Sequence, residues 1–484
     1  FVDGPSAGAA MAVAVSAALQ NKEIREDAII TGTINKYGEI GTVGGLSEKV
    51  KAASDSGKSY FLTPLPSVRS RIITAALEDI ENIKIIDIRT LNEAAEILFQ
   101  PTGTKINKTI NPLEHTEMSD ALLGINVQAD KELEEFAQIG HSMADEFEST
   151  IRAYGLIIGE DSSRYEFVEY FNEEMDIQRQ LLDKGYLFTA ANNIFLNMID
   201  FEFLTEVGSI DLEAETNEVN SCINSIDLCE KTEDNWQWIS SAEMRLNWAK
   251  DKIEYLPTLS ETRTEGEEYP LLYELLYAKS WCHVSKKLNK QGTGKIINET
   301  VLMDYAKDKI ELEEEFISKQ PEISSEALRH LRTAEDAFNT GQYITAIYDT
   351  CFAHAFQTSV SDEFYEKDIE NKADEMYYRD DRESLWGKLY LTQAKFIYES
   401  GKKKDAYIIF ILSENFENAT KEIEEKLIEE GGYIEPERET QLEEDEEQLE
   451  IDYQMLTFIL ICLLIIESTY LFLLIKPKKQ EKKR

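Results

Sequence analysis

A serine and a lysine near the start of the chain supply the two groups needed for nucleophilic acyl transfer. Ser6 lies in the segment DGPSAG, at the entry to an Ala-rich helical segment, and Lys49 lies in GGLSEKV, near the start of another. A serine hydroxyl attacks a carbonyl carbon when a neutral amine within hydrogen-bonding reach removes its proton. The pair therefore predicts hydrolysis of an acyl bond, with Ser6 as the nucleophile and Lys49 as the general base.

The predicted surroundings favour this chemistry. The backbone N–H groups at a helix start can stabilise an oxyanion that forms next to Ser6. A lysine acts as a base only when it is uncharged, which burial among apolar neighbours and the positive end of a helix both favour. The alternative is that Ser6 caps a helix and Lys49 is a solvated helix residue. For either residue alone this alternative is preferred, but the pair in its context favours catalysis.

Residues 1–100 alternate between helical and strand patterns and therefore predict an α/β layer domain. Helices are expected at Ala7–Gln20, Ser47–Ser56, Val68–Leu77 and Leu91–Phe99, the last with Thr90 as its N-cap, and strands at Ala28–Ile34, Ile40–Val43, Ser59–Thr63 and Ile83–Ile88. The stretch AASDSGKS (52–59) fits a relaxed phosphate-loop pattern. We expect no phosphate site there, because a helix precedes it and a strand follows, which is the reverse of the order that such a loop needs.

DGPSAG, followed 43 residues later by GGLSEKVKAA, resembles the proteolytic domain of Lon-type proteases, a family of serine–lysine peptidases. Thr31-Gly32, Gly38 and the segment FLTP (61–64) agree with the same family. The resemblance covers about residues 1–100, the C-terminal half of the family's domain. It implies a fold like ribosomal protein S5 domain 2, polypeptide substrates, no cofactor or metal, and the possibility of a homo-oligomeric ring.

The resemblance also assigns roles to individual residues. Ser6 stands at the position of the nucleophile and Lys49 at that of the general base, with supporting positions at Asp3, Gly4 and Thr31. The expected function is a Lon-like serine endopeptidase that works through an acyl-enzyme. The alternative is an inactive Lon-like scaffold whose helical part binds proteins at a membrane surface.

After a linker at residues 101–117, a helical pattern covers residues 118–434. Three hairpin-like signatures recur in it, each a Gly that ends one helix and an Ala five residues later that permits close packing: Gly185 with Ala190, Gly341 with Ala346, and Gly401 with Ala406. These pairs resemble tetratricopeptide hairpins, but the glycines do not follow a strict repeat. An irregular repeat array and an ordinary helical bundle therefore both remain open.

The end of the chain predicts a membrane anchor. An acidic linker at residues 435–454 precedes 21 mostly apolar residues, 455–475, which are long enough to span a bilayer as a helix. The basic tail at residues 476–484 is then expected in the cytoplasm and the main body outside it. The predicted fold class is therefore mainly α: an N-terminal α/β region, a large irregular helical domain and a C-terminal transmembrane helix.

The start of the sequence and the predicted location lead to one further expectation each. The sequence starts without Met, and Phe1-Val2 reads as the end of a strand, so the chain is expected to be an N-terminally truncated fragment. A body outside the cytoplasm would lack ATP, so the peptidase is expected to work without an ATPase motor.

Charge and cysteine content limit the partners. The formal net charge is −43, and residues 101–454 alone carry about −44, so the surface repels phosphate backbones and nucleic-acid binding is not expected. The five cysteines form no CxxC pair, which argues against a structural zinc site. Cys222 and Cys229 are seven residues apart, which is awkward for a disulfide between them, and the redox state of the cysteines stays open.

Overall fold

The computed structural model describes residues 5–65, 67–106, 130–160, 164–260, 268–361, 368–379 and 381–435, together with residues 113, 115, 116, 118, 122, 124, 125 and 162. Internal contacts hold Phe1–Glu435 together as one compact unit. The predicted acidic linker, membrane span and basic tail lie outside the described residues, apart from Glu435. Asp3 and Gly4 also lie outside them.

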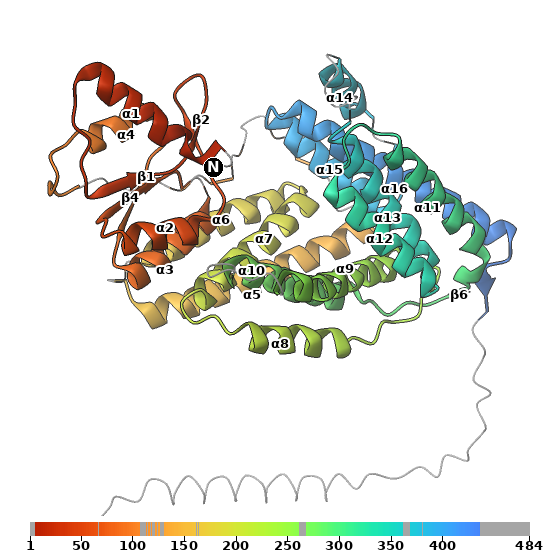
Figure 1. Cartoon of the computed structure of the whole chain (residues 1–484). Helices are drawn as coiled ribbons and strands as arrows, with labels where there is room; N and C mark the ends of the chain where they lie inside the picture. Colours follow the sequence, from red (N-terminus) through yellow and green to blue (C-terminus); the bar gives the residue numbers. More distant parts are fainter. Residues whose placement is uncertain are drawn as a thin grey trace, which may run out of the picture. The chain divides into compact units, whose positions relative to one another are not determined.

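The α/β region, residues 5–106, consists of short strands with helices on both sides (Figure 1). Its elements are η1 (Pro5–Ala7), α1 (Gly8–Gln20), β1 (Ala28–Ile30), β2 (Thr33–Ile34), β3 (Ile40–Gly41), α2 (Leu46–Asp55), β4 (Tyr60–Thr63), α3 (Val68–Glu81), β5 (Lys84–Asp87) and α4 (Leu91–Leu98).

Two small sheets organise this region. β1, β4 and β5 form a parallel sheet in the order β1-β4-β5, in which Ile29 pairs with Phe61 and Phe61 pairs with Ile85. β2 and β3 form a separate antiparallel hairpin. Asn35 stabilises its turn, because its side-chain oxygen accepts hydrogen bonds from the backbone N–H groups of Tyr37 and Glu39.

Alternate residues of the parallel strands face opposite layers, as the pleat of a strand requires. Leu62 and Ile86 belong to a core that contains residues of α1 and α4, whereas Phe61 and Ile85 belong to a core that contains residues of α2 and α3. Figure 1 shows the same arrangement, with α1 and α4 on one side of β1 and β4, and α2 and α3 on the other. The predicted α/β layer arrangement is therefore confirmed.

Individual elements of the α/β region also agree with their predictions. Thr90 caps α4 by accepting a hydrogen bond from the Glu93 N–H, and the Glu93 side chain completes a capping box. The predicted strand at 28–34 is wrong in one respect, because it is two strands, β1 and β2, that belong to different sheets. The break lies at Gly32, where an added Cβ would lie 2.3 Å from Ile40 Cγ2, so the Ile40 side chain occupies the space that a side chain at position 32 would need.

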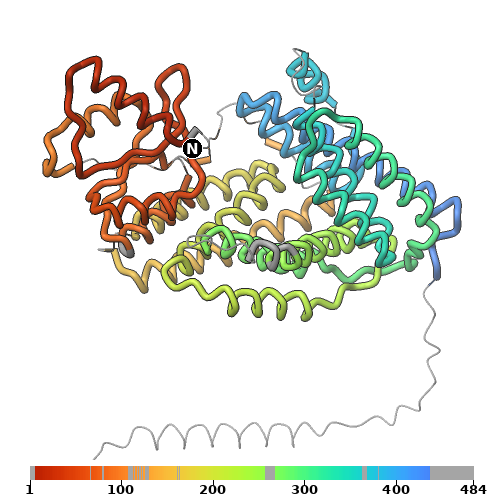
Figure 2. Tube along the Cα trace, viewed as in Figure 1, coloured from red at the N-terminus to blue at the C-terminus, as the bar shows by residue number. Residues whose placement is uncertain are grey.

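The helical region, residues 130–435, follows the α/β region, and Figure 2 traces its course from α5 to β7. Its elements are α5 (Lys131–Ile158), α6 (Tyr165–Asp183), α7 (Leu187–Glu206), α8 (Leu212–Asn224), α9 (Trp236–Ser260), α10 (Glu268–Leu288), β6 (Ile296–Ile297), η2 (Glu299–Leu302), α11 (Met303–Ser318), α12 (Ser325–Asn339), α13 (Tyr343–Thr358), α14 (Ile369–Tyr377), α15 (Leu385–Glu399), α16 (Lys403–Glu429) and β7 (Tyr433–Ile434).

The three predicted hairpin signatures are confirmed. Gly185, Gly341 and Gly401 adopt positive φ angles of 85°, 81° and 80° directly after α6, α12 and α15. The alanines five residues later, on α7, α13 and α16, are completely buried, as the close packing of two helices requires. Other helices begin with side-chain caps from Asp130, Asp211, Ser324 and Ser384.

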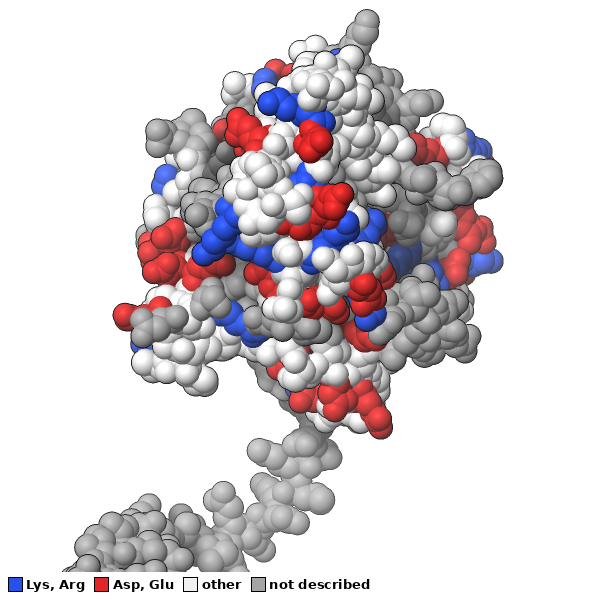
Figure 3. Space-filling view, turned by 60° about the vertical axis from the view of Figure 1, so that its left-hand side comes forward, with Lys and Arg blue, Asp and Glu red and all other residues white. Residues whose placement is uncertain are grey.

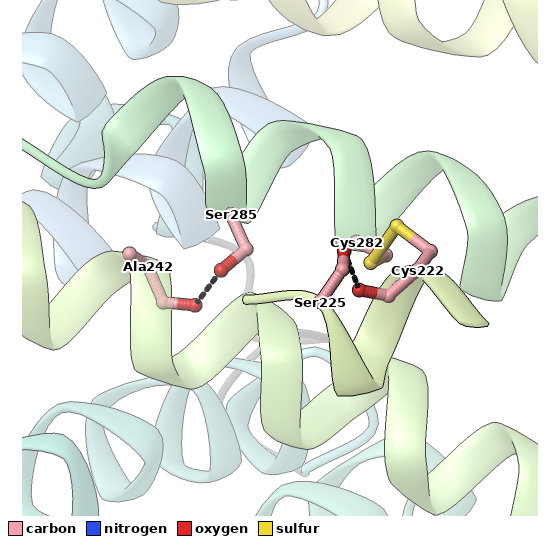
Figure 4. The surroundings of a disulfide bond; sticks show 5 residues. All are labelled: Cys222, Ser225, Ala242, Cys282 and Ser285. Carbon is pink, nitrogen blue, oxygen red and sulfur yellow. Dashed lines mark hydrogen bonds between the residues drawn. A yellow bond between two sulfur atoms is a disulfide. The ribbon is translucent and has the colours of Figure 1, made fainter. Parts of the chain in front are cut away.

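Two features outside the hairpins stabilise the helical region. A disulfide joins Cys222 on α8 to Cys282 on α10, as Figure 4 shows, and it closes a loop of 60 residues. Lys231, 5% exposed, forms ion pairs with Glu243 and Glu299 in the interior. Burial opposes its charged form, but the two carboxylates more than offset this effect and raise the pKa of Lys231.

The structure corrects the predicted fold class and location. The fold class included a transmembrane helix at residues 455–475, and the location was inferred from that helix. Across the described ranges, no helix is both long and apolar enough to cross a membrane. Long helices such as α5 and α16 alternate apolar residues with Glu and Lys, because only part of their surface is buried. The described fold is mainly helical with a small α/β region, and the location inferred from the anchor has no support in it.

Candidate active site

Ser6 lies in η1, immediately before α1, and is half-buried. Its backbone carbonyl accepts hydrogen bonds from the Gly32 N–H at 3.0 Å and from the Thr31 hydroxyl at 3.1 Å. Thr31 is 7% exposed, and its own N–H donates to the Leu62 carbonyl of β4. The backbone of Ser6 is therefore fixed to the segment between β1 and β2, and Thr31 is the side chain that holds it.

Small residues allow the start of α1 to approach the hairpin. The Ala9 N–H donates to the Gly32 carbonyl at 3.0 Å, and a Cβ added at Gly8 would lie 3.2 Å from Ile34 Cγ2. No side chain among the described residues caps this helix, because its N-cap is Ala7. The hairpin occupies the Ala9 N–H, but the positive end of α1 still lies next to Ser6, where a helix N-terminus favours negative charge such as that of an oxyanion.

Lys49 lies on the first turns of α2 and is half-buried. Its amine donates hydrogen bonds to the backbone carbonyls of Gly44 and Gly45, the two residues that precede the helix. Gly45 has a positive φ of 63°, and a Cβ at this position would lie 3.3 Å from the Lys49 Nζ atom. A glycine is therefore favoured here by the backbone conformation, and a larger residue would also displace the lysine amine by a few tenths of an ångström.

The β2–β3 hairpin links the segment that holds Ser6 to the helix that carries Lys49. Ser6 is attached to the segment that leads into β2, and β3 leads through Gly44 to the helix that carries Lys49. Within the part of the chain that the structure describes, no hydrogen bond joins the Ser6 hydroxyl to the Lys49 amine. The dyad therefore remains a prediction, as do the roles of Asp3 and Gly4, which lie outside the described residues.

An ion pair anchors the end of the α/β region beside β1. Arg25, 3% exposed, holds the Asp27 carboxylate, and its hydrogen bond lowers the pKa of Asp27 to about 2. Arg25 also donates to the Thr104 carbonyl, and Asp27 accepts from the Gly103 N–H. These contacts fix the chain after α4 and have no direct role at Ser6.

Two other kinds of site, a nucleic-acid surface and a metal centre, would depend on how charged and metal-ligating side chains are grouped. Figure 3 shows Lys and Arg side chains interspersed with Asp and Glu on one face, without a continuous basic strip there. Among the described residues, no three His, Cys, Asp or Glu side chains are grouped to hold a metal ion. The segment 52–59, which resembles a phosphate loop, runs from the last turn of α2 to the start of β4, in the order that argues against a phosphate site.

Comparison with protein families assigns the α/β region. Residues 2–100 match the C-terminal proteolytic domain of Lon protease (S16). This Lon-type segment contains both Ser6 and Lys49, and the helical region lies outside the match. The family comparison and the relatives below support a serine peptidase.

Curated relatives are also Lon proteases, and their similarity to this chain covers 99 to 132 residues. Lon protease 2 of Bacillus subtilis is 36% identical over 101 residues, which are 21% of this chain and 17% of that protein. Lon protease 1 of Hydrogenovibrio crunogenus is 30% identical over 132 residues, 27% of this chain and 16% of that protein. The archaeal Lon protease of Thermococcus kodakarensis is 31% identical over 99 residues, which are 20% of this chain and 15% of that protein. The chain thus spans less than a fifth of these relatives.

The sequence indicated the Lon-type segment but not how its lysine is held. The carbonyls of Gly44 and Gly45 and the close approach at Gly32 are backbone features, which motif spacing does not reveal. The Gly-Gly pair directly before the lysine helix was the available signal, because two glycines before a helix start indicate an unusual backbone path.

Proposed function

We propose that this chain forms part of a Lon-type serine endopeptidase that hydrolyses peptide bonds in polypeptide substrates through Ser6 and Lys49. The main support is the match of residues 2–100 to the Lon proteolytic domain. The uncapped start of α1 next to Ser6 supports an oxyanion site, and Thr31 supports the position of the serine. The proposal does not include independence from ATP, because that prediction depended on a location outside the cytoplasm that was inferred from the predicted membrane anchor.

In the proposed reaction, the Ser6 hydroxyl oxygen bonds to the substrate carbonyl carbon while its proton passes to the Lys49 amine. Collapse of the tetrahedral intermediate breaks the carbon–nitrogen bond, and Lys49 returns the proton to the leaving amine. A water molecule then gives up a proton to Lys49 and attacks the carbonyl carbon of the acyl-enzyme. The bond from that carbon to the Ser6 oxygen breaks, Lys49 returns the proton to the Ser6 oxygen, and the product leaves as a carboxylic acid that ionises in water. Before the first step, the Lys49 amine must exchange the carbonyls of Gly44 and Gly45 for the Ser6 hydroxyl.

The test is cleavage of a fluorogenic casein-type substrate by the complete protein and its variants. Ser6→Ala and Lys49→Met are expected to lose cleavage, whereas Lys51→Met, two positions along α2, keeps it. Cleavage that survives in both dyad variants would contradict the proposal.

The second candidate is an inactive scaffold whose helical region binds proteins. One observation favours it: the Lys49 amine is bound to backbone carbonyls rather than to Ser6. If the wild-type complete protein cleaves no substrate and still retains polypeptides in a pull-down, this candidate replaces the first.

Assembly into a homo-oligomeric ring is part of the same proposal. Met11, Val15 and Leu19 lie on one face of α1 and are 58%, 60% and 83% exposed, an apolar stripe suited to contact with another copy. Light scattering of the complete protein is expected to show an oligomer that Val15→Glu dissociates. An unchanged mass for this variant would remove the stripe from the proposed interface.

A further inference from the structure

A cavity of about 370 Å³ lies inside the helical region, away from Ser6 and Lys49. It is partly open, residues of α5, α7, α9, α10, α12, α13, α15 and α16 line it, and its walls are mainly aromatic and aliphatic. Among the aromatic residues are Trp248, Trp281, Trp386 and Phe352. Its size is within the range of cavities that bind small organic molecules, about 300–1,000 Å³.

The charges on the cavity wall contrast with those of the chain. The chain has 93 acidic and 50 basic residues, yet no Asp or Glu lines this cavity among the described residues. Arg245, Arg329 and Lys287 do line it. In a chain this acidic, a wall that carries only basic charged groups indicates an anionic ligand.

Arg245 is the most informative of these groups. It is 6% exposed, and its guanidinium lies 4.9 Å from the ring of Trp248 and 5.1 Å from that of Trp386. Its Nη1 atom has no hydrogen-bond partner, and no described carboxylate forms an ion pair with it. A buried cation without a counter-charge is costly, and an anion in the cavity would compensate it.

A row of hydrogen-bonded side chains fixes a second guanidinium, that of Arg329, on the cavity wall. The Arg329 Nη2 atom lies 3.0 Å from His330 Nε2, and His330 Nδ1 lies 3.0 Å from Asp349 Oδ1. Burial lowers the pKa of His330, so its ring is neutral: Nδ1–H donates to Asp349 and Nε2 accepts from Arg329. Glu326 binds the outer side of Arg329, whose Nη1 atom is buried without a partner.

We propose that this cavity binds a carboxylate that is carried on an apolar body. The aromatic wall accommodates the body, and Arg245 and Arg329 accommodate the carboxylate, since guanidinium groups bind carboxylates well. Such a carboxylate has two sources, a free apolar acid or the C-terminus of a peptide that ends in an apolar residue. The inference does not rest on peptidase activity at Ser6.

Titration of the full chain with paired probes tests the inference. The probes are decanoate and decanol, and the peptide Ala-Leu-Phe with either a free carboxylate or a C-terminal amide. Binding is followed by the fluorescence of the tryptophans in the wall and, independently, by calorimetry. We expect at least one of the two acids to bind at least ten times more tightly than its neutral partner, and which of them binds identifies the source.

Variants connect that preference to the cavity. Arg245→Met keeps apolar bulk and is expected to weaken binding of the acid at least tenfold, to the level of the neutral probe, whereas Arg245→Lys retains part of the preference. Arg332→Met removes an arginine of α12 that is paired with Asp251 and does not line the cavity, and it is expected to bind like the wild type. Circular dichroism checks that each variant is folded.

Three results would overturn the inference: no acid binds, acid and neutral probe bind the wild type equally, or folded Arg245→Met binds the acid as tightly as the wild type does. The first two concern the unmodified chain, so they decide the question even if a variant fails to fold.

Discussion

Thr31→Val separates the positioning of Ser6 from the stability of the fold. The substitution keeps the shape of the side chain and removes the hydroxyl that donates to the Ser6 carbonyl at 3.1 Å. That carbonyl keeps its bond from the Gly32 N–H at 3.0 Å, so no buried acceptor is left without a partner. The expected loss of stability is therefore only about 1 kcal/mol, the usual net value of one hydrogen bond.

The expected effect on catalysis is larger. Misplacement of a reacting group by about 1 Å can lower a rate on the order of 100-fold, so a loosened Ser6 backbone is expected to lower kcat by about 10- to 100-fold. Thr31 does not act on the substrate itself, and KM is expected to change little. Thr31→Ser, which restores the hydroxyl, is expected to recover most of the rate.

The assay combines urea unfolding with peptide cleavage by the complete protein. Thr74→Val is the matched control, because Thr74 is similarly buried in the α/β region and its hydroxyl also donates to a backbone carbonyl, that of Arg71 at 3.0 Å. The control is expected to lose similar stability but to keep kcat. Equal kcat losses in both variants would refute the positioning role, as would an unchanged kcat in Thr31→Val.

Three further predictions concern the helical region. Cys282→Ala opens a 60-residue loop and is expected to cost about 4 kcal/mol in urea unfolding; a midpoint unchanged from that of the oxidised wild type would contradict the disulfide. Lys231→Met leaves two buried glutamates unpaired and is expected to cost about 3–5 kcal/mol, and a loss below about 1 kcal/mol would argue against the buried network. Burial raises the pKa of Asp200 to about 6, so its contribution to stability is present below about pH 4 and is lost as the pH rises to about 6. Asp200→Asn removes this dependence, and parallel pH profiles for variant and wild type would contradict it.

Local signals made much of the fold predictable. The cap at Thr90 and the glycines that end α6, α12 and α15 depend on residues that are close in sequence, so short windows contain the information. The division of the segment 28–34 was missed because it depends on Gly32, whose backbone lies against Ile40 in three dimensions. The predicted transmembrane helix came from apolar length alone, which gives no information on packing.

The candidate site was predictable in its residues but not in its contacts. The spacing of Ser6 and Lys49 led to the Lon-type segment, which the family match supports. The hydrogen bonds of Lys49 to its own turn depend on a side-chain rotamer and on the left-handed Gly45, and neither is encoded in a motif. Arg245 was not a candidate, because its burial without a counter-charge results from helices that are distant in sequence.

The proposed mechanism depends on the acylation of Ser6 with the help of Lys49. The direct measurement is mass spectrometry of the complete protein after brief reaction with an activated peptide ester and quenching in acid. An acyl group is expected on the peptide that contains Ser6 of the wild type, and none on the same peptide of Lys49→Met. Cleavage of substrate without acylation at Ser6, or acylation that is undiminished in Lys49→Met, would contradict it.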